Sequence, residues 1–297
     1  MNKIIYLGVT QFVKEHKDFV DVNQIYRDIP GFLRPVRKFF FDFDLPFKQI
    51  WLIKDFKNSI ADYDTIILSA TLYNIKISKI IDSYKFKNKQ LIFWYWNPVD
   101  KICSPSKISA SWEKWSFDKK DCEKYNLKYN NTYYFEKFIS NIAQETKYQV
   151  SFIGQDKGRL KLLLAIEKEL KNLGITFYFH VVQDRTSVLD YAYKSRLNYH
   201  EILNIIQASD VLLDIVQNGQ SGLTLRVMES LFFSKKIISN NTEIIRYDFY
   251  NPSNIFIIGK DSLEELLAFM ETDYVPINKD ILKNYTVENW LNNFAKN

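Results

Sequence analysis

Residues 148–174 read YQVSFIGQDKGRLKLLLAIEKELKNLG, and this stretch decides the fold of the second half of the chain. Residues 148–154 form a short, mostly apolar run that ends in glycine, which predicts a buried strand. Over residues 159–172 apolar side chains recur every three or four positions, as on the buried face of a helix. Gly174 ends that helix, because glycine adopts the left-handed conformation without strain. Strand, turn and helix in this order predict a parallel α/β sheet.

The same alternation continues toward the C-terminus, which predicts a doubly wound domain. Further strands are expected at Ile175–Val182, Val211–Ile215, Lys236–Ser239 and Ile255–Ile258. Helices are expected at Tyr199–Ala208, Leu223–Phe233 and Ser262–Met270, the last with Ser262 and Glu265 as a capping box, and a terminal helix at Val287–Lys296.

The first half shows the same pattern less clearly. Strands are expected at Lys3–Val9, Gln49–Ile53, Thr65–Ser69 and Gln90–Trp96, and a helix at Ile75–Tyr84. A chain of 297 residues is about twice the usual domain length. We therefore expect an N-terminal Rossmann-like domain (1–145), a C-terminal Rossmann-like domain (146–275) and a helical tail (276–297).

Composition excludes several classes of protein. With 46% hydrophobic and 25% charged residues, the chain is neither disordered nor a polytopic membrane protein. Its apolar runs are only as long as strands. The apolar run near residue 1 is too short for a signal peptide, so we expect a cytoplasmic protein. Cys103 and Cys122 show no metal or disulfide spacing and are expected to be structural.

Charge is shared unevenly along the chain. Residues 1–149 carry 24 Lys and Arg against 17 Asp and Glu, whereas residues 150–297 carry 16 against 18. The basic half suits an anionic substrate or an anionic lipid surface, although a Lys-rich composition from an AT-rich genome would give the same excess. The basic residues are scattered and no nucleic-acid-binding motif is present, so no nucleic-acid partner is expected.

Two loops of the second half predict an anion site. One runs from Gly154 through Lys157 to Arg159, and the other from Asn218 to Arg226. Both follow strands and precede helices, where backbone N–H groups, hydroxyls and guanidinium groups favour a phosphate. Each loop alone is a weak signal and neither matches a known phosphate motif, but together they predict a diphosphate clamp.

Four stretches of the second half resemble the nucleotide-sugar half of GT-B glycosyltransferases. More narrowly, they resemble bacterial capsule, exopolysaccharide and lipopolysaccharide-core transferases. They are Phe152–Arg159, Gln207–Asp214, Ser221–Leu231 and Lys235–Asn241. The resemblance covers residues 148–260 and is only topological before them. It implies two Rossmann-like doubly wound α/β domains that face a cleft, the GT-B fold, with residues 1–145 as the acceptor-side domain and residues 146–275 as the nucleotide-sugar-binding domain.

The resemblance also implies site residues. Glu229 corresponds to the ribose-binding second glutamate of the family's E-x7-E motif, whereas the first glutamate falls at Ser221. This departure leaves retention or inversion at the anomeric carbon open. The residues expected at the substrate are Gly8, Thr10, Gly154, Lys157, Val182, Gln183, Arg196, Tyr199, Ser221, Gly222, Leu223, Thr224 and Glu229.

Sugar transfer builds negative charge on the departing diphosphate, so fixed cations stabilise the transition state. Arg159 and Arg226, with Lys157, are the candidates, and a permanent guanidinium charge replaces a divalent metal in this interpretation. An inverting enzyme also needs a base. Asp100, after the strand that ends near Trp96, is the first candidate; Asp18 and His16 are the others.

Two aromatic stretches allow other interpretations. Trp94, Tyr95 and Trp96 could stack on sugars, but alternation along a strand favours core packing for at least one face. Asp42 and Asp44 form a DxD sequence, the metal motif of the other major glycosyltransferase fold. That fold would not explain residues 148–260, so no metal or other cofactor is expected.

The leading hypothesis is a metal-independent hexosyltransferase. It would move a sugar from a nucleotide-diphosphate donor, expected to be UDP-linked, to a glycan or lipid-linked glycan during synthesis of a bacterial surface polysaccharide. Peripheral contact with the inner membrane leaflet would follow from the basic first half. The alternatives are a nucleotide-sugar epimerase of the same fold and a non-catalytic nucleotide-sugar-binding subunit, for which the missing first glutamate is the main argument.

Overall fold

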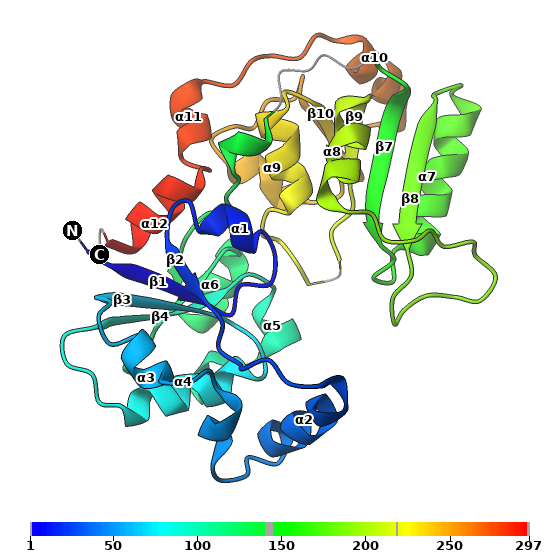
Figure 1. Ribbon diagram of the computed structural model, residues 1–297. Coiled ribbons are helices and arrows are strands. Elements are labelled where there is room, and N and C mark those ends of the chain that lie inside the picture. The colour runs from blue at the N-terminus through cyan, green and yellow to red at the C-terminus, as the bar shows by residue number, and fades with distance from the viewer. Residues whose placement is uncertain (1, 140–144, 218, 296–297) are drawn as a thin grey trace. The chain divides into compact units, whose positions relative to one another are not determined.

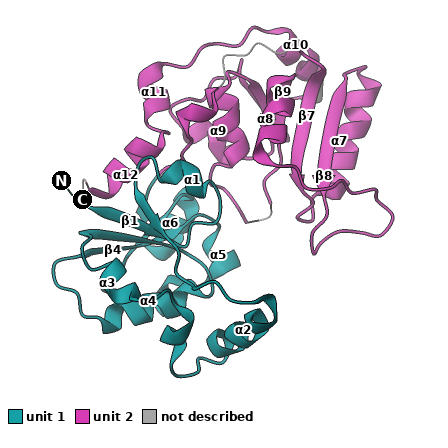
Figure 2. Ribbon diagram, in the orientation of Figure 1, with its two compact units in different colours: residues 1–130 teal, residues 131–297 magenta. Residues whose placement is uncertain are grey.

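The computed structural model describes residues 2–139, 145–217 and 219–295. The chain divides into two compact units, residues 1–130 and 131–297 (Figure 2). Each unit is built on one parallel sheet with helices packed against it (Figure 1), as the alternating pattern predicts. Among the described residues, no helix has both the length and the apolar character needed to cross a membrane.

The sheet of unit 1 has six parallel strands in the order β2-β1-β3-β4-β5-β6. Its strands are β1 (Ile4–Leu7), β2 (Asp21–Asn23), β3 (Thr65–Ser69), β4 (Gln90–Tyr95), β5 (Glu113–Ser116) and β6 (Lys128–Tyr129). The helices are α1 (Val13–His16), α2 (Arg34–Asp42), α3 (Phe56–Ser59), α4 (Asn74–Ser83), α5 (Val99–Ile102) and α6 (Lys119–Tyr125), with 3-10 turns η1 (Gly31–Leu33), η2 (Lys48–Trp51) and η3 (Pro105–Lys107).

Burial explains the central strands of unit 1. Residues 66–68 of β3 are all fully buried, which is the pattern of a parallel strand covered on both faces. Trp94 and Tyr95 of β4 are also fully buried, although alternation sends them to opposite faces. The prediction that this aromatic group serves core packing is thereby confirmed for these two residues.

One strand predicted for unit 1 is wrong. Residues 49–53 do not form a strand of the sheet; they belong to the 3-10 turn η2 and an isolated antiparallel bridge between Leu52 and Tyr26. Trp51 and Leu52 are both buried, so this apolar run closes a turn over the core instead of alternating between two faces. Strands β2, β5 and β6 were not expected; they are only three, four and two residues long, and their residues include polar or charged ones.

Gly8 follows β1 at a point where only glycine fits. Its φ is +76°, and a Cβ added there would lie 2.6 Å from Nδ2 of Asn74. That nitrogen donates to the carbonyl oxygen of Ser69 at 2.7 Å, so Asn74 fixes the start of α4 to the end of β3 beside the glycine. The residue is thus explained by close packing at the carboxyl edge of this sheet.

Gly8→Ala should lower the free energy of unfolding by about 2 kcal/mol or more, because it adds a clash with Asn74 to the cost of a left-handed alanine. Gly158→Ala is the matched control, since Gly158 has φ +75° but no atom within 4 Å of an added Cβ. Urea unfolding followed by circular dichroism measures both. Equal losses in the two variants would show that the contact with Asn74 costs nothing.

The sheet of unit 2 has five parallel strands in the order β11-β10-β9-β7-β8. Its strands are β7 (Tyr148–Gln155), β8 (Phe177–Val182), β9 (Ser209–Asp214), β10 (Lys236–Ser239) and β11 (Ile255–Ile257). The helices are α7 (Leu160–Asn172), α8 (Tyr199–Gln207), α9 (Leu225–Phe232), α10 (Leu266–Glu271), α11 (Lys279–Lys283) and α12 (Val287–Ala295), with 3-10 turns η4 (Glu136–Phe138), η5 (Thr242–Arg246) and η6 (Leu263–Glu265).

The strands expected in the second half agree with the structure to within two residues at each end. The helix expected from Ser262 begins instead with η6, where Glu265 accepts a hydrogen bond from the amide of Ser262 at 3.1 Å as one half of the expected capping box. Helix α11 was not expected, because its five residues carry no clear amphipathic period.

The division between the units lies at 130/131, before the boundary expected at 145/146. Residues that follow the division pair with the C-terminal segment: the amide of Tyr134 donates to the carbonyl of Tyr285 at 2.8 Å. The ring of Tyr133 packs against Trp290 of α12 with centroids 4.3 Å apart. The helical tail is therefore packed within unit 2, and long-range contacts of this kind leave no local signal in the sequence.

Candidate functional site

Unit 2 places the ends of β7 and β9 next to each other in its sheet. From β7 the chain continues to β8 on one side, and β9 lies on the other side, so the strand order changes direction between β7 and β9. In open parallel sheets ligands bind beyond the carboxyl ends of the strands at such a point. The loops that leave this edge are residues 156–159 and 215–224, the two that the sequence predicts as an anion site.

Arg159 lies across the ends of both strands. Its Nε and Nη2 donate to the carbonyl oxygen of Gln155 at 3.1 and 2.9 Å, and its Nη1 donates to the carbonyl oxygen of Ile215. The guanidinium carbon lies 5.1 Å from the ring centroid of Phe152. A Cβ on Gly154 would lie 2.8 Å from Nη2, so the glycine makes room for the guanidinium group.

Arg226 reaches the same edge from α9. Its Nη2 donates to the carbonyl oxygen of Ile153 at 3.2 Å, and its Nη1 lies 2.6 Å from Oε2 of Glu229. Glu229 is 1% exposed, and its Oε1 accepts from the hydroxyl of Tyr199 at 3.0 Å. Burial raises the pKa of Glu229. The glutamate expected to bind ribose is thus engaged by protein side chains in this structure.

A second buried carboxylate, Asp214 at the end of β9, joins three elements. Its Oδ1 accepts from the hydroxyl of Thr224 at 2.8 Å and its Oδ2 from the hydroxyl of Ser239 at 3.0 Å. Burial raises the pKa of Asp214, although the charges of Arg159 and Arg226 oppose that shift. Burial lowers the pKa of Arg159, and the charge of Arg226 adds to this effect. The edge therefore concentrates two guanidinium groups beside two buried acids.

The amides of the first loop already have protein acceptors. The amide of Lys157 donates to Oδ2 of Asp184 at 2.8 Å, and that of Gly158 to Oγ1 of Thr186 at 2.7 Å. The next two amides both donate to Oδ1 of Asp156 at 3.1 Å. A phosphate held by these amides would first have to displace Asp184 and Thr186, so side-chain cations are the more accessible donors.

Lys157 is the exposed cation of this loop. Burial of part of the side chain and the charge of Arg159 lower the pKa of Lys157, while Asp184 opposes the shift. For Asp184 burial raises the pKa, but hydrogen bonds from Thr186 and from the amide of Lys157 outweigh it and give a net lowering. Asp184 therefore stays charged beside Lys157, where a bound anion would compete with it.

Residues 221–224 lead into α9. The hydroxyl oxygen of Thr224 accepts from the first turn of that helix at 3.4 Å, which makes Thr224 the N-cap. Side chains of Thr132 and Asn241 donate to carbonyl oxygens of this segment at 2.9 and 3.0 Å. Gly222 and Leu223 are buried within it. Asn218 lies outside the described residues.

Four residues expected at the substrate lie between the end of β8 and the start of α8: Val182, Gln183, Arg196 and Tyr199. Val182 ends β8, and its carbonyl oxygen accepts from the amide of Asp156 at 3.0 Å. Tyr199, at the start of α8, contacts Glu229 as described above. Gln183 and Arg196 are exposed in the loop between β8 and α8. Of these four, Tyr199 is the one that the structure joins directly to the glutamate.

Unit 1 holds the remaining candidates. Thr10 is exposed two residues after Gly8 at the end of β1. Asp100 is exposed in the first turn of α5 and accepts from the hydroxyl of Tyr125 and, at 2.9 Å, from Nζ of Lys124. These two donors lower the pKa of Asp100. A carboxylate with a lowered pKa is a weaker general base.

The DxD sequence has a structural explanation. Nζ of Lys38 lies 2.6 Å from Asp42 in α2, and Asp44 is paired with Lys48 at 2.7 Å and Lys76 at 3.0 Å. The two lysines lower the pKa of Asp44 to about 2. Within the described part of the chain, no cluster of three or more His, Cys, Asp or Glu side chains is arranged to hold a metal ion.

Three acids at this edge were not predicted as site residues from the sequence: Asp156, Asp184 and Asp214. Asp156 and Asp214 directly follow or end a strand, a position that could have drawn attention to them. Asp184 had no such signal, because its contact with the first loop is made across 27 residues of chain. Asp156 and Asp184 accept from backbone amides of the first loop, and Asp214 lies close enough to Arg159 and Arg226 for their charges to lower its pKa.

Comparison with known proteins supports the fold. No protein-family model matches the sequence, and no curated protein sequence is significantly similar to it. Among solved structures, sucrose-phosphate synthase from Thermosynechococcus elongatus is similar over 100% of this chain and 98% of its own, with 9% identity and a TM-score of 0.60. HepE from Anabaena, solved with UDP-glucose, is similar over 100% and 99%, with 9% identity and a TM-score of 0.51.

The same Anabaena protein solved with UDP is similar over 99% of this chain and 98% of its own, with 8% identity and a TM-score of 0.51. The chain has the GT-B fold. The prediction of a GT-B chain of two Rossmann-like units from residues 148–260 is confirmed at the level of the fold.

Breaking the buried pair of Arg226 and Glu229 should be costly. Arg226→Met leaves a carboxylate without its partner, so we expect the free energy of unfolding to fall by about 3–5 kcal/mol at neutral pH. The deficit should shrink as the pH is lowered, because the buried carboxyl binds a proton at higher pH in the folded state than in the unfolded state.

The double variant Arg226→Met with Glu229→Gln serves as the control, since it removes both charges and keeps an acceptor for Tyr199. It should recover at least about 1 kcal/mol relative to Arg226→Met alone. Urea unfolding followed by circular dichroism at several pH values measures the cycle. Strictly additive effects would contradict a coupled pair.

Proposed function

We propose that this protein is a glycosyltransferase that moves a sugar from a nucleotide-diphosphate sugar to a glycan or lipid-linked glycan acceptor. The observation that carries the proposal is the meeting of Arg159 and Arg226 at the point where the strand order of the second sheet changes direction, in a chain of GT-B fold. Two permanent cations at such an edge suit a diphosphate.

In this proposal the guanidinium groups are held in place before the donor binds. Arg159 is fixed by the carbonyls of Gln155 and Ile215, and Arg226 by Glu229. Because these contacts exist in the free protein, little reorganisation is needed when charge develops on the leaving diphosphate. Lys157 is exposed in the loop, and its ammonium group would be a third cation in contact with the phosphates.

The proposed donor is UDP-linked. The Anabaena HepE structures of similar fold contain UDP or UDP-glucose, and this supports a test of UDP-sugars first. The resemblance to bacterial surface-polysaccharide transferases favours a hexosyl group and a lipid-linked acceptor at the inner leaflet. Asp100 is the proposed general base of an inverting reaction. Its lowered pKa makes it a weaker base for the acceptor hydroxyl.

A second function is favoured by one feature of the sequence. Ser221 stands where the resemblance expects a carboxylate that contacts the sugar. A hydroxyl cannot supply that charge, which supports a subunit that binds a nucleotide sugar without turning it over. The epimerase alternative is distinguished from both by its product.

Lys157→Ala should lower turnover of the donor about a hundred- to thousandfold, the loss expected when one preorganised donor to a developing charge is removed. Its side chain is exposed, so the fold should be kept. Lys161→Ala, an exposed lysine in the first turn of α7, is the matched control and should retain wild-type turnover. Wild-type turnover in Lys157→Ala would contradict its assignment.

A panel of UDP, GDP, CDP and CMP in a thermal-shift assay identifies the base, since a ligand at a hundred times its Kd stabilises the fold by about 2.7 kcal/mol. Product analysis with the matching sugars then separates the functions. Transfer or hydrolysis supports the leading proposal, interconversion an epimerase, and binding without turnover a binding subunit. Activity that is lost in chelator would overturn metal independence.

A further inference from the structure

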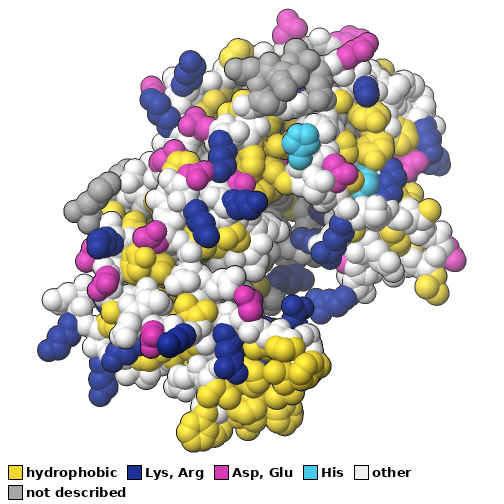
Figure 3. Space-filling view, viewed as in Figure 1, with side chains coloured by type: hydrophobic (Ala, Val, Ile, Leu, Met, Phe, Trp, Pro, Cys, Tyr) yellow, Lys and Arg dark blue, Asp and Glu magenta, His cyan; other side chains and the backbone are white. Residues whose placement is uncertain are grey.

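The most unusual surface of unit 1 surrounds α2. Six apolar side chains are exposed there, and we call them the α2 apolar patch: Phe32, Val36, Phe39, Phe43, Phe47 and Ile50. Three of them, Phe32, Phe43 and Phe47, are 76%, 66% and 75% exposed. Figure 3 shows a continuous group of hydrophobic side chains over this end of unit 1, with Lys and Arg side chains along its edge.

The patch is a consequence of helical spacing. Residues 32, 36, 39 and 43 are separated by four, three and four positions, so they share one face of the helical segment formed by η1 and α2. Phe41 lies on the other side and is 3% exposed, packed against Tyr26 with ring centroids 5.5 Å apart. The core therefore uses one apolar face of α2 and leaves a second apolar face in solvent.

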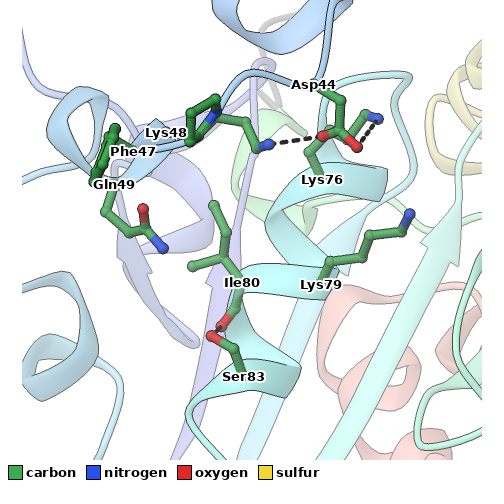
Figure 4. Close-up of a pocket in the computed structure, with 9 residues that line it drawn as sticks. Asp44, Phe47, Lys48, Gln49, Lys76, Lys79, Ile80 and Ser83 are labelled. Atoms are coloured by element: carbon green, nitrogen blue, oxygen red, sulfur yellow. Dashed lines mark hydrogen bonds and ion pairs between the residues drawn. The ribbon is translucent and has the colours of Figure 1, made fainter.

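Basic groups accompany the patch. Residues 27–54 contain six Lys and Arg against three Asp. Beside Phe47 an open pocket of about 280 Å³ is lined by Lys48, Lys76 and Lys79 (Figure 4). Lys48 and Lys76 share Asp44, whereas Lys79 makes no ion pair with the residues drawn. The cationic charge next to the apolar surface thus exceeds the charge of its own acids.

This combination fits a bilayer better than a protein. Phenylalanines on one face of a short helix with Lys and Arg beside them are typical of segments that lie in the membrane interface. Anionic lipid head groups attract such cations, with each Lys or Arg near the surface strengthening binding about fivefold. A self-associating face would bring the cations of two copies together, which opposes binding to itself.

We propose that the α2 apolar patch is the surface through which unit 1 binds an anionic lipid bilayer. The phenylalanine rings enter the interface, and the lysines beside Phe47 contact the phosphates of the head groups. The membrane contact belongs to the function proposed above, but this surface is argued from its own residues. Its test needs no sugar donor, so it can succeed or fail independently of glycosyl transfer.

Sedimentation with vesicles tests the proposal. The full chain should bind vesicles of equal parts phosphatidylcholine and phosphatidylglycerol, bind phosphatidylcholine alone much less, and lose binding as salt is raised. The variant Phe43→Ser with Phe47→Ser should weaken binding to the anionic vesicles about tenfold or more. Arg34→Glu with Lys79→Glu, two exposed cations, should do the same.

Matched controls lie in unit 2. Leu189→Ser removes a fully exposed apolar side chain, and Lys161→Glu with Lys168→Glu reverses two exposed cations of α7. Both should bind vesicles as the wild type does. Failure of the wild type to bind anionic vesicles would overturn the proposal, as would unchanged binding by Phe43→Ser with Phe47→Ser. A dimer in sedimentation equilibrium that these serines convert to monomer would assign the patch to self-association instead.

Discussion

Hydrogen bonds from one guanidinium group to the ends of two strands organise the second unit. Arg159 donates to the carbonyl oxygens of Gln155 and Ile215, and so satisfies backbone acceptors that the sheet leaves without a partner at its carboxyl edge. Gly154 follows from this contact, because any side chain there would meet the guanidinium group. The same contacts hold a permanent cation at the edge of the sheet where we propose that the diphosphate binds.

Buried acids make that arrangement stable. Two guanidinium groups at one edge repel each other, and removal from water penalises both. Asp214 and Glu229 offset these costs, and hydroxyls of Thr224 and Tyr199 donate hydrogen bonds to these acids. The edge is thus a network in which the charges of two guanidinium groups and two acids oppose one another within the protein. A ligand would bind to a site whose donors are already oriented.

Helix α2 of unit 1 has one apolar face in the core and a second apolar face in solvent. The helix buries Phe41 against the core, yet the residues that share the opposite face are phenylalanine and valine where a purely structural helix would carry polar groups. Such exposure has a cost in solubility that nothing within unit 1 explains. A bilayer surface would cover the apolar side chains and pair the neighbouring cations.

Sequence alone determined the parallel α/β class, because apolar runs and amphipathic periods are local and the strands from β7 to β11 agree with them. It also predicted Arg159 and Arg226 as site residues, because they lie in or next to glycine-containing loops after strands. It missed η2, where an apolar run closes a turn, and the short strands β2, β5 and β6. Tertiary structure alone decided that the ends of β7 and β9 are neighbours, that Asp184 holds the first loop across 27 residues, and that Glu229 is paired with Arg226. Strand order and burial depend on contacts between residues far apart in the chain, and no local pattern of residues encodes them.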